Sequence, residues 1–465
     1  MANQRTLTRR QFLHAPLAAS AACAASTVVA APAKARTWRA GVGKTKITPS
    51  GPVWMAGYGA RNRECDTTAQ DLWAKALALE DPNGAKSVLL ALDSCGIGRE
   101  VAANITRDIE RRFRLPPAAV LINMSHSHCS PFTEGLVWAM REFTTGEWSR
   151  IVGYTRQLEQ QAVAAVGAAL AALEPVTLAH GKSATGFAVN RRNNVEADVP
   201  RLRAEKKIVG PVDHDVPVLA IRRLDGTTKA IVCSYACHTT TLNGYEWNGD
   251  YAGFAQEEIE RRHASATAFF TQGCGGDINP LPRRTMELAR GYGRALADAV
   301  DRAFKAKMEP ITGSLRTNLE RVELAFSEGP TRKALEAAAA ADESPKNRYE
   351  RMRARHLLSE LDRGEKLSRS YPYPVQSWRL GQLTWIALGG EPVIEYSLAL
   401  KKALGLRTWV LGYSSEIMAY IPSERVLSEG GYEGATSMVV FGLPAPWAPG
   451  LEQKILHTAQ RLARA

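Results

Sequence analysis

Residues 120–128 read VLINMSHSH, a short strand-forming run that ends abruptly in two serines alternating with two histidines. The run Val120–Met124 is short and largely apolar, which predicts a buried β-strand. Open α/β sheets bind ligands outside the carboxyl ends of their strands. The segment Ser125–His128 therefore stands where such a sheet would carry a functional site.

Three further predicted strands end in polar or glycine-rich segments of the same kind. They are Thr228–Tyr235 before His238-Thr239-Thr240, Ala266–Thr271 before the loop Gln272–Asn279, and Gln382–Leu388 before Gly389-Gly390-Glu391. If these strands are neighbours in one sheet, their polar segments meet in a single crevice.

The rest of the chain supplies helices. Apolar residues from Ile151 to Leu173 recur at spacings of three and four, which predicts a long amphipathic helix that ends near Pro175. Further helices are expected at Tyr251–His263, Thr285–Phe304, Thr331–Ala341, Lys346–Leu361 and Leu451–Arg464. Strands interleaved with helices indicate an α/β fold. We expect a single domain over residues 36–465, with a mixed central β-sheet flanked by helices.

The composition is that of an ordinary globular protein. Of 465 residues, 45% are apolar and 23% are charged, which excludes a disordered or fibrous chain. The net charge of +12 is partly local, because residues 1–35 hold four of the 59 basic residues and none of the 47 acidic ones. The other basic residues are scattered and not interleaved with aromatic residues, so we expect no nucleic-acid partner.

The first 35 residues are typical of an export signal. Thr8–Leu13 is a twin-arginine pattern, Ala15–Ala31 is weakly apolar, and Ala33-Lys34-Ala35 offers a small-x-small cleavage site. An uncleaved membrane anchor would need about 20 strongly apolar residues, and this run is shorter and rich in alanine. We therefore predict a twin-arginine signal peptide over residues 1–35, export by the twin-arginine machinery and a periplasmic or secreted location. No later segment is expected to span a membrane.

His126 and His128 differ from the other histidines in their setting. Side chains two residues apart on an extended backbone point the same way, so both rings are expected to face the crevice. One would suit a metal ligand and the other a neighbouring acid/base group. A competing site is a structural zinc held by cysteines, since Cys233 and Cys237 lie close to His238 in the chain. The sequence has no Cys-x-x-Cys pair, which favours buried, apolar thiols instead.

Several of these segments recur, in the same order, in the neutral ceramidase family, which the chain resembles from about residue 38 to residue 445. The shared segments are Gly41–Pro49, Met55–Gly59, Ser125–His128, Asn190-Arg191, His238–Thr240, Gln272–Pro280, Gly390-Glu391 and Tyr420–Ala435. Each motif alone is weak, and their common order makes the resemblance strong. It implies the fold of the family's N-terminal catalytic domain, without the β-sandwich domain into which ceramidases continue.

The resemblance implies a zinc-dependent amidase. The metal ligands would be two histidines, a glutamate and a tyrosine, namely His126, His238, Glu391 and Tyr420. Zinc lowers the pKa of a bound water from 15.7 to about 7 and so supplies a hydroxide nucleophile. The remaining family positions fall on His128, Arg191 and Tyr432. The histidine would pass a proton to the leaving amine, and the arginine and tyrosine would donate hydrogen bonds to the oxyanion.

One departure from the family leaves the substrate open. Ceramidases carry a serine, proposed to take part in catalysis, in the loop after Gly276-Asp277, and Asn279 takes that place here. A metal-bound hydroxide needs no such serine. The sequence therefore predicts hydrolysis of an N-acyl amide, ceramide or another small-molecule or lipid-like compound, by metal-activated water.

Two alternatives remain. The same zinc site would also suit an ester, lactone or sugar-derived substrate, and a non-catalytic binding protein would keep the fold. Without the resemblance, Glu391 reads as an acidic residue at a helix N-terminus, and Tyr420 and Tyr432 read as packing residues.

Overall fold

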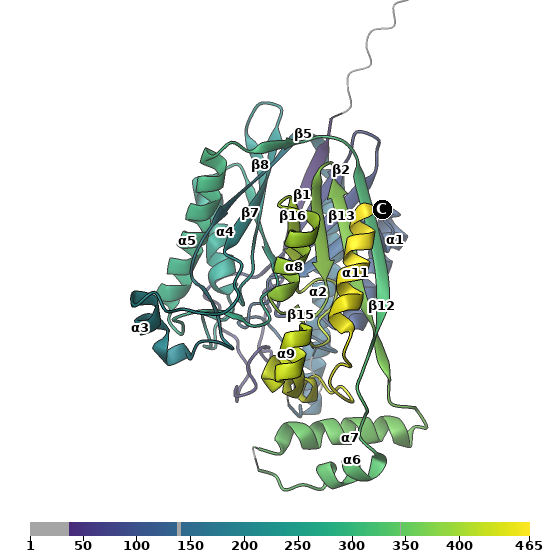
Figure 1. Ribbon diagram of the computed structural model, residues 1–465. Helices are drawn as coiled ribbons and strands as arrows, with labels where there is room; N and C mark the ends of the chain where they lie inside the picture. The colour runs from purple at the N-terminus through teal and green to yellow at the C-terminus, as the bar shows by residue number, and fades with distance from the viewer. Residues whose placement is uncertain (1–36, 137–140, 345) are drawn as a thin grey trace, which may run out of the picture. The chain divides into compact units, whose positions relative to one another are not determined.

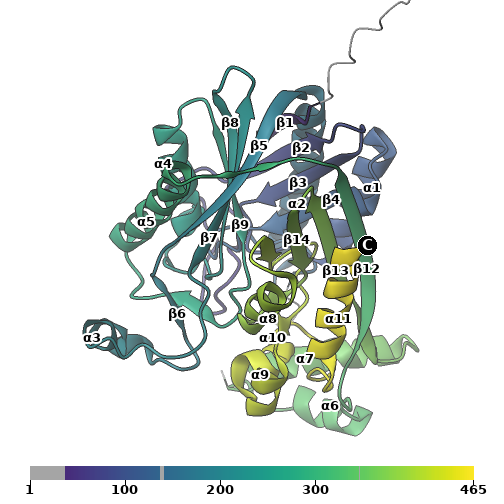
Figure 2. The same cartoon turned by 45° about the horizontal axis from the view of Figure 1, so that its top comes forward.

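The fold rests on two stacked β-sheets, which the computed structural model describes over residues 37–136, 141–344 and 346–465. In this part of the chain the larger sheet has nine strands, in the order β4-β3-β2-β1-β5-β7-β8-β9, with β11 paired to β5 (Figure 2). They are β1 (Arg39–Lys46), β2 (Trp73–Glu80), β3 (Lys86–Leu92), β4 (Val120–Met124), β5 (Glu174–Ala184), β7 (Asp215–Arg223), β8 (Thr228–Tyr235), β9 (Thr267–Gln272) and β11 (Glu309–Ile311). The pairs β3–β4 and β8–β9 are parallel and the others are antiparallel, so the sheet is mixed, as predicted.

The smaller sheet lies against one face of the larger sheet. Its order is β12-β13-β14-β16, and only its last pair is parallel among the described strands. The strands are β12 (Leu315–Ala325), β13 (Ser370–Leu380), β14 (Leu383–Leu388) and β16 (Thr408–Leu411). Leu89 and Leu121 of the larger sheet share one apolar core with three stacked tryptophans of the smaller sheet, Trp378, Trp385 and Trp409.

Helices cover the outer face of each sheet (Figure 1). On the larger sheet they are α1 (Arg99–Phe113), α2 (Thr145–Ala171), α4 (Asp250–Arg262) and α5 (Met286–Lys305), and on the smaller sheet α8 (Glu395–Leu404) and α11 (Leu451–Arg464). Helix α2 packs closely because β1 carries glycines there. A Cβ on Gly41 or Gly43 would lie within 2.0 Å of a backbone carbonyl oxygen of α2. The predicted α/β fold with a mixed sheet and flanking helices is confirmed, with a second sheet added between the helix layers.

The polar segments meet in the folded chain. Their strands, however, are not all neighbours in one sheet, which was the condition stated for that meeting. Only β8 and β9 pair directly, whereas β4 stands at the opposite end of the sheet order and β14 belongs to the smaller sheet. The fully buried Asn123 of β4 joins these ends. Its Oδ1 accepts a hydrogen bond from Gln272 N at 2.8 Å, and its Nδ2 donates to the Gly412 carbonyl at 2.8 Å, just after β16.

The remaining described elements are short, apart from helix α7. They are β6 (Ala188–Asn190), β10 (Ile278–Pro280), β15 (Glu391–Pro392), β17 (Tyr420–Ile421), α3 (Val199–Ala204), α6 (Arg332–Ala339), α7 (Arg348–Asp362), α9 (Glu424–Glu429) and α10 (Ser437–Val440), with helical turns at Pro117–Ala119, Glu196–Asp198 and Tyr432–Thr436. Helices α6 and α7 lie between β12 and β13 in the chain and share a small apolar core around Leu335, Ala354 and Leu357 (Figure 1).

The predicted signal peptide, residues 1–35, lies outside the described residues. In the part of the chain that is described, no helix combines the length and the apolar character that crossing a bilayer requires.

Candidate active site

Three side chains from distant parts of the chain meet at one buried point: His126, His238 and Glu391. The Oε2 atom of Glu391 lies 3.3 Å from His126 Nε2 and 3.1 Å from His238 Nε2. Tetrahedral zinc with bonds of about 2.0–2.2 Å needs neighbouring ligand atoms about 3.3 Å apart. The three atoms are thus spaced as ligands of one metal ion would be.

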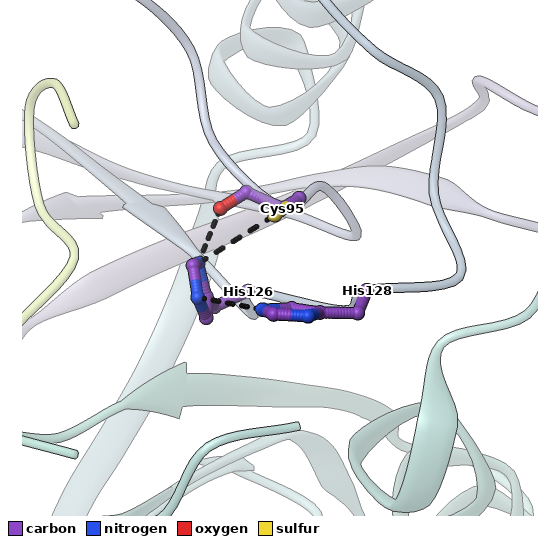
Figure 3. Close-up of side chains that lie close together, drawn as sticks. All are labelled: Cys95, His126 and His128. Atoms are coloured by element: carbon purple, nitrogen blue, oxygen red, sulfur yellow. Dashed lines mark hydrogen bonds between the residues drawn. The ribbon is translucent and has the colours of Figure 1, made fainter. Parts of the chain in front are cut away.

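Each of these histidines is oriented by a backbone carbonyl. Figure 3 shows the His126 ring with its Nδ1 turned to the Cys95 carbonyl oxygen, at 2.5 Å. His238 Nδ1 faces the Gly275 carbonyl oxygen, also at 2.5 Å. A carbonyl oxygen can only accept, so Nδ1 carries a proton in both rings and Nε2 is the atom directed at the site. This orientation is the one that a metal-ligating histidine requires.

Glu391 and Tyr420 reach the cluster from two short strands. Strands β15 and β17 pair in parallel, with Glu391 opposite Tyr420. The approach is close, because a Cβ on Gly390, which has a φ of +65°, would lie 2.6 Å from the Ala419 carbonyl oxygen. Tyr420 Oη lies 3.4 Å from His238 Nε2. The phenol oxygen therefore lies beside the imidazole and carboxylate atoms of the cluster.

Burial and mutual contact set the charges of the cluster. Burial alone would raise the pKa of Glu391, but His126 and His238 hold it well below its ordinary value. Burial lowers the pKa of His238 to about 4. Burial also acts to lower the pKa of His126, but the neighbouring Cys95 and Glu391 outweigh it and raise that pKa to about 10. Near neutral pH the metal-free cluster therefore pairs an ionised carboxylate with one protonated histidine, and a bound metal ion would replace that proton.

His128 lies beside the cluster, although not by the geometry that the sequence predicted. Its Nε2 is 3.1 Å from His126 Nε2, and the two rings meet edge to face (Figure 3). The backbone at His126 is left-handed, with a φ of +58°, so the expected extended conformation is wrong. Burial, with His126 and His238 nearby, lowers the pKa of His128 well below its usual value, so this ring is neutral.

Arg191 is anchored at four points. Its Nε donates to Glu433 Oε1 at 2.8 Å, and its Nη2 donates to the Gly276 carbonyl at 2.7 Å and to Tyr420 Oη at 3.3 Å. Its Nη1 donates to Asn279 Oδ1 at 3.3 Å. A guanidinium has five N–H groups, so the contacts given for the described residues engage four of them and leave one N–H of Nη1.

The cluster borders a cavity of about 220 Å³, which has an apolar side formed by Leu136, Ile417 and Phe441. Most of the predicted site residues line it, namely His126, His128, Arg191, Glu391, Tyr420 and Tyr432. His238, the other predicted residue, has no exposed surface. Tyr432 is the most exposed of the set, at 47%. The structure therefore brings together all the residues that the sequence analysis proposed.

The competing cysteine site is not assembled. The six cysteines of the described residues are free and buried. Among those residues, possible metal ligands gather as Cys95 with His126 and His128, and as His126 with His238 and Glu391. Cys233 and Cys237 belong to neither group, so the described residues form no structural zinc site around them.

Residues 38–286, more than half of the chain, match the sequence profile described as neutral/alkaline non-lysosomal ceramidase, N-terminal. The chain belongs to this ceramidase family. The resemblance inferred from the order of the motifs is thereby confirmed. The matched segment of this chain includes His126, His128, Arg191 and His238. The other predicted site residues lie after residue 286.

Solved ceramidase structures share the fold. A crystal structure of neutral ceramidase from Pseudomonas aeruginosa matches with a TM-score of 0.70 at 17% sequence identity, over 92% of this chain and 74% of that chain. A ceramidase complexed with C2 matches with a TM-score of 0.69 at 16% identity, over 92% of this chain and 75% of that chain. A search of curated protein sequences finds no significant match.

Sequence reasoning missed two residues of this ceramidase-family site. Tyr413 Oη lies 3.4 Å from Glu391 Oε2 and 3.4 Å from His238 Nδ1. Cys95 Sγ lies 3.9 Å from His126 Nδ1. Tyr413 follows the carboxyl end of β16, and Cys95 follows the carboxyl end of β3. The rule that ligands bind outside the carboxyl ends of strands, which drew attention to His126, therefore also points to these two residues.

Proposed function

We propose that the protein is a zinc-dependent hydrolase of N-acyl amides, with residues 36–465 as its catalytic domain and His126, His238, Glu391 and Tyr420 as its metal ligands. The observation that carries the proposal is the convergence of two imidazole nitrogens on one carboxylate oxygen, at 3.3 and 3.1 Å. Two histidines and a glutamate that leave a position for water are typical of catalytic zinc. Membership of the ceramidase family supports a hydrolase that acts on amide bonds.

Zinc bound by these residues would lower the pKa of a coordinated water to about 7 and so supply a nucleophile near neutral pH. Arg191 holds one N–H for the oxygen on which negative charge develops, and its contacts with Glu433 and Gly276 fix it before the reaction begins. Tyr432 adds a hydroxyl donor from the cavity wall. Donors held in place in this way typically contribute about 10²–10³ each to the rate.

His128 is the acid/base group of the proposal. Because its pKa is lowered by burial, the ring is neutral and accepts a proton at Nε2, next to the cluster. It then delivers that proton to the leaving amine, which departs as a neutral molecule. Asn279 has no hydroxyl to form an acyl-enzyme, and its carboxamide accepts a hydrogen bond from Arg191. Direct attack by water is the route that these residues support.

Metal analysis of the purified protein beside a His238→Ala variant tests the ligand assignment. We expect one zinc per chain in the wild type and none in the variant. His263→Ala is the matched control, because His263 pairs with Asp301 away from the cluster and its loss should leave zinc bound. Zinc retained by His238→Ala, or absent from the wild type, would contradict the assignment.

An ester, lactone or sugar-derived substrate is the second candidate, favoured by Asn279 in the place of the family's serine. Amide and ester probes with the same acyl group separate the two, through the ratio of their kcat/KM values. Zinc binding without hydrolysis of any probe would instead indicate a non-catalytic binding protein.

We also propose export through the twin-arginine route to the periplasm or the medium. The support is the Arg9-Arg10 pair and the Ala33-Lys34-Ala35 cleavage site. Replacing both arginines with lysine should retain the precursor in the cytoplasm, and the exported protein should begin at Arg36. Export that survives the double substitution would refute this route.

A further inference from the structure

The catalytic cavity has two kinds of lining. Four of its residues carry apolar side chains: Leu136, Ile417, Val440 and Phe441. Leu136 and Ile417 lie side by side, since a Cβ on Gly96 would be 2.7 Å from each of them. Three other lining residues, which we call the polar wall, are Tyr58, Thr240 and Arg283. Both kinds of lining border the same space as the proposed metal site, so a substrate that fills this space contacts both.

Hydrogen bonds between distant segments hold the polar wall together. Tyr58 Oη donates to the Thr240 carbonyl at 3.4 Å. Arg284 Nη1 donates to Tyr58 Oη at 3.0 Å, and Arg284 N donates to the Thr241 carbonyl at 2.6 Å. These bonds fix Arg283, the residue before Arg284, beside the segment that carries Thr240.

His128 relates the polar wall to one side of the scissile bond. The rings of Tyr58 and His128 meet edge to face, with centroids 4.7 Å apart. The approach is close, because a Cβ on Gly57 would lie 2.3 Å from the His128 ring. In the proposed mechanism this ring delivers a proton to the leaving amine. The polar wall therefore faces the amine side of the substrate, and the apolar lining remains for the acyl group.

Positive charge exceeds negative charge around Tyr58. The guanidinium carbons of Arg61 and Arg284 lie 5.0 and 5.3 Å from the centre of its ring. Neither arginine forms an ion pair with a residue that the structure describes, and the buried Arg61 donates to backbone carbonyls instead. The buried Asp250 is the carboxylate that acts on Tyr58, and it accepts hydrogen bonds from backbone N–H groups. Two cations against one carboxylate leave a positive excess at the polar wall.

Arg283 presents its guanidinium to the cavity with donors to spare. Its Nε donates to Glu196 Oε1 at 2.8 Å and its Nη2 to Glu196 Oε2 at 2.6 Å, so this pair is neutral as a whole. These contacts leave one N–H of Nη2 and both N–H groups of Nη1, two nitrogens that can hold a second carboxylate by parallel bonds. The nearby Thr240 hydroxyl has no hydrogen-bond partner among the described residues. The wall thus offers several donors for one acceptor group.

The charge and the donors together select among amine-side groups. The arginines would repel a cationic group. A neutral group would accept hydrogen bonds without offsetting the positive excess. A carboxylate accepts two parallel N–H bonds and also balances the charge, and such charge-assisted bonds are about twice as strong as neutral ones.

We propose that Arg283 and the polar wall bind a carboxylate on the amine side of the substrate, so that the substrate class is an N-acyl amino acid. Water attacks the acyl carbon, the C–N bond breaks and the nitrogen takes a proton, which releases a carboxylic acid and an amino acid. The inference rests on the proposed function, since the scissile bond is taken to lie at the His126–His238–Glu391 cluster. It goes beyond that function by naming the group that leaves with the nitrogen.

N-octanoyl-glycine and N-octanoyl-glycinamide test the proposal, because they differ only in a carboxylate and a carboxamide of nearly the same size. Release of octanoate by the zinc-loaded wild type should show a kcat/KM for the glycine amide at least about tenfold higher, mainly through a lower KM, as expected for hydrogen bonds to a charged group. Arg283→Gln should abolish this preference by raising KM for N-octanoyl-glycine. Arg283→Lys, which keeps the charge and loses the fork of donors, should retain part of it.

Arg407→Gln is the matched control for Arg283→Gln. Arg407 is also paired with a glutamate, Glu309, at 2.8 Å, and it lies outside the lining of the catalytic cavity. This variant should keep the full preference for N-octanoyl-glycine. A thermal melt of each variant checks that the substitution leaves the fold intact, and the side chain of Arg283 is 13% exposed, so its replacement buries no unpaired charge in the core.

The outcomes separate this inference from the proposed function. Equal kcat/KM values for the two amides, a preference for the glycinamide, or a preference for the glycine that survives Arg283→Gln would each overturn the carboxylate subsite while leaving the hydrolase in place. Cleavage of N-methyloctanamide without cleavage of N-octanoyl-glycine would overturn it in the same way. If the zinc-loaded wild type cleaves none of the three amides, the proposed amide hydrolysis fails, and the inference fails with it.

Discussion

Tyr420 and Tyr432 show how neighbouring side chains of one type take different parts in the site. Their ring centroids are 5.2 Å apart, but Tyr420 is 5% exposed and contacts His238, whereas Tyr432 is 47% exposed. Tyr432→Phe should therefore lower kcat about 10²–10³-fold, as expected for loss of an oxyanion donor. Zinc content and Tm should not change, because this hydroxyl contributes little to packing. Steady-state kinetics, zinc analysis and a thermal melt check the three expectations, and an unchanged kcat would remove Tyr432 from the mechanism.

Glu433 joins two arginines at the edge of the same site. Its carboxylate accepts from Arg191 at 2.8 Å and from Arg192 at 2.7 Å. Burial alone would raise the pKa of Glu433, but Arg191 and Arg192 hold it below its ordinary value. A carboxyl group with a depressed pKa in the folded state contributes stability above its unfolded pKa of about 4.3. That contribution is lost as the pH falls through the folded-state pKa.

The pH dependence gives a prediction for Glu433→Gln. At pH 7 the variant should lose about 3–5 kcal/mol of stability, the range for breaking one partner of a buried pair. The difference in Tm from the wild type should begin to shrink as the pH falls below the unfolded pKa of about 4.3, and it should vanish below the depressed folded-state pKa, where the wild-type carboxyl is protonated as well. Glu336→Gln is the control. Glu336 is exposed and lies 3.9 Å from Arg332, so its replacement should change the Tm little at any pH. A Tm difference that stays constant with pH would contradict the ion-pair explanation.

At the scale of elements, Asn123 closes the sheet around the site. Its side chain bonds to Gln272 at the end of β9, to the Gly412 carbonyl and to Ser414 Oγ. Asn123→Leu would leave Gln272 N and the Gly412 carbonyl buried without this partner, at about 1–3 kcal/mol each. We expect a clear fall in Tm together with weaker zinc binding, because His126 follows three residues later.

Asn318→Leu is the matched control for that experiment. Asn318 Nδ2 donates to the Leu462 carbonyl at 3.3 Å from a partly exposed position on β12. Its loss should cost about 1 kcal/mol or less and leave zinc binding unchanged. Equal effects of the two substitutions on zinc binding would show that Asn123 has no special role in holding the strand ends together.

The sequence predicts an element well where the residues of that element alone determine its conformation, and poorly where pairing with distant strands determines it. Strands β4 and β8 match the prediction, because each is a short buried run with a clear end. Strand β2 was missed because it reads WAKALALE, whose residues favour helix, and only pairing with β1 and β3 makes it a strand. Strand β12 was missed because most of its side chains are at least partly exposed, which leaves little apolar alternation.

The site shows the same division between local and long-range information. Its residues were predictable because each lies in a short motif and the motifs occur in the family's order. The geometry was not predictable, since the positive φ at His126 and the Asn123–Gln272 contact depend on segments that meet only in the folded chain. Cys95 and Tyr413 lie in no motif that the sequence analysis recognised, and their place beside the cluster follows from sheet pairing.

At the scale of the whole catalytic unit, the proposed metal would connect its two sheets. His126 and His238 follow strands of the larger sheet, whereas Glu391, in β15, lies three residues beyond the end of β14 of the smaller sheet. A ligand that binds only the folded state stabilises it by about 2.7 kcal/mol at a concentration of 100 times its Kd. Removing the metal with a chelator should therefore lower the Tm of the wild type, and added zinc should restore it.

The variant that lacks one ligand makes this prediction decisive. His238→Ala should already melt at a lower temperature, and the chelator should not lower it further, because the site no longer holds a metal. Tyr432→Phe, which leaves the proposed ligands intact, should respond to the chelator as the wild type does. Thermal melts of the three proteins with and without chelator provide the comparison. A chelator effect of equal size in His238→Ala and in the wild type would place the stabilising metal outside the His126–His238–Glu391 cluster.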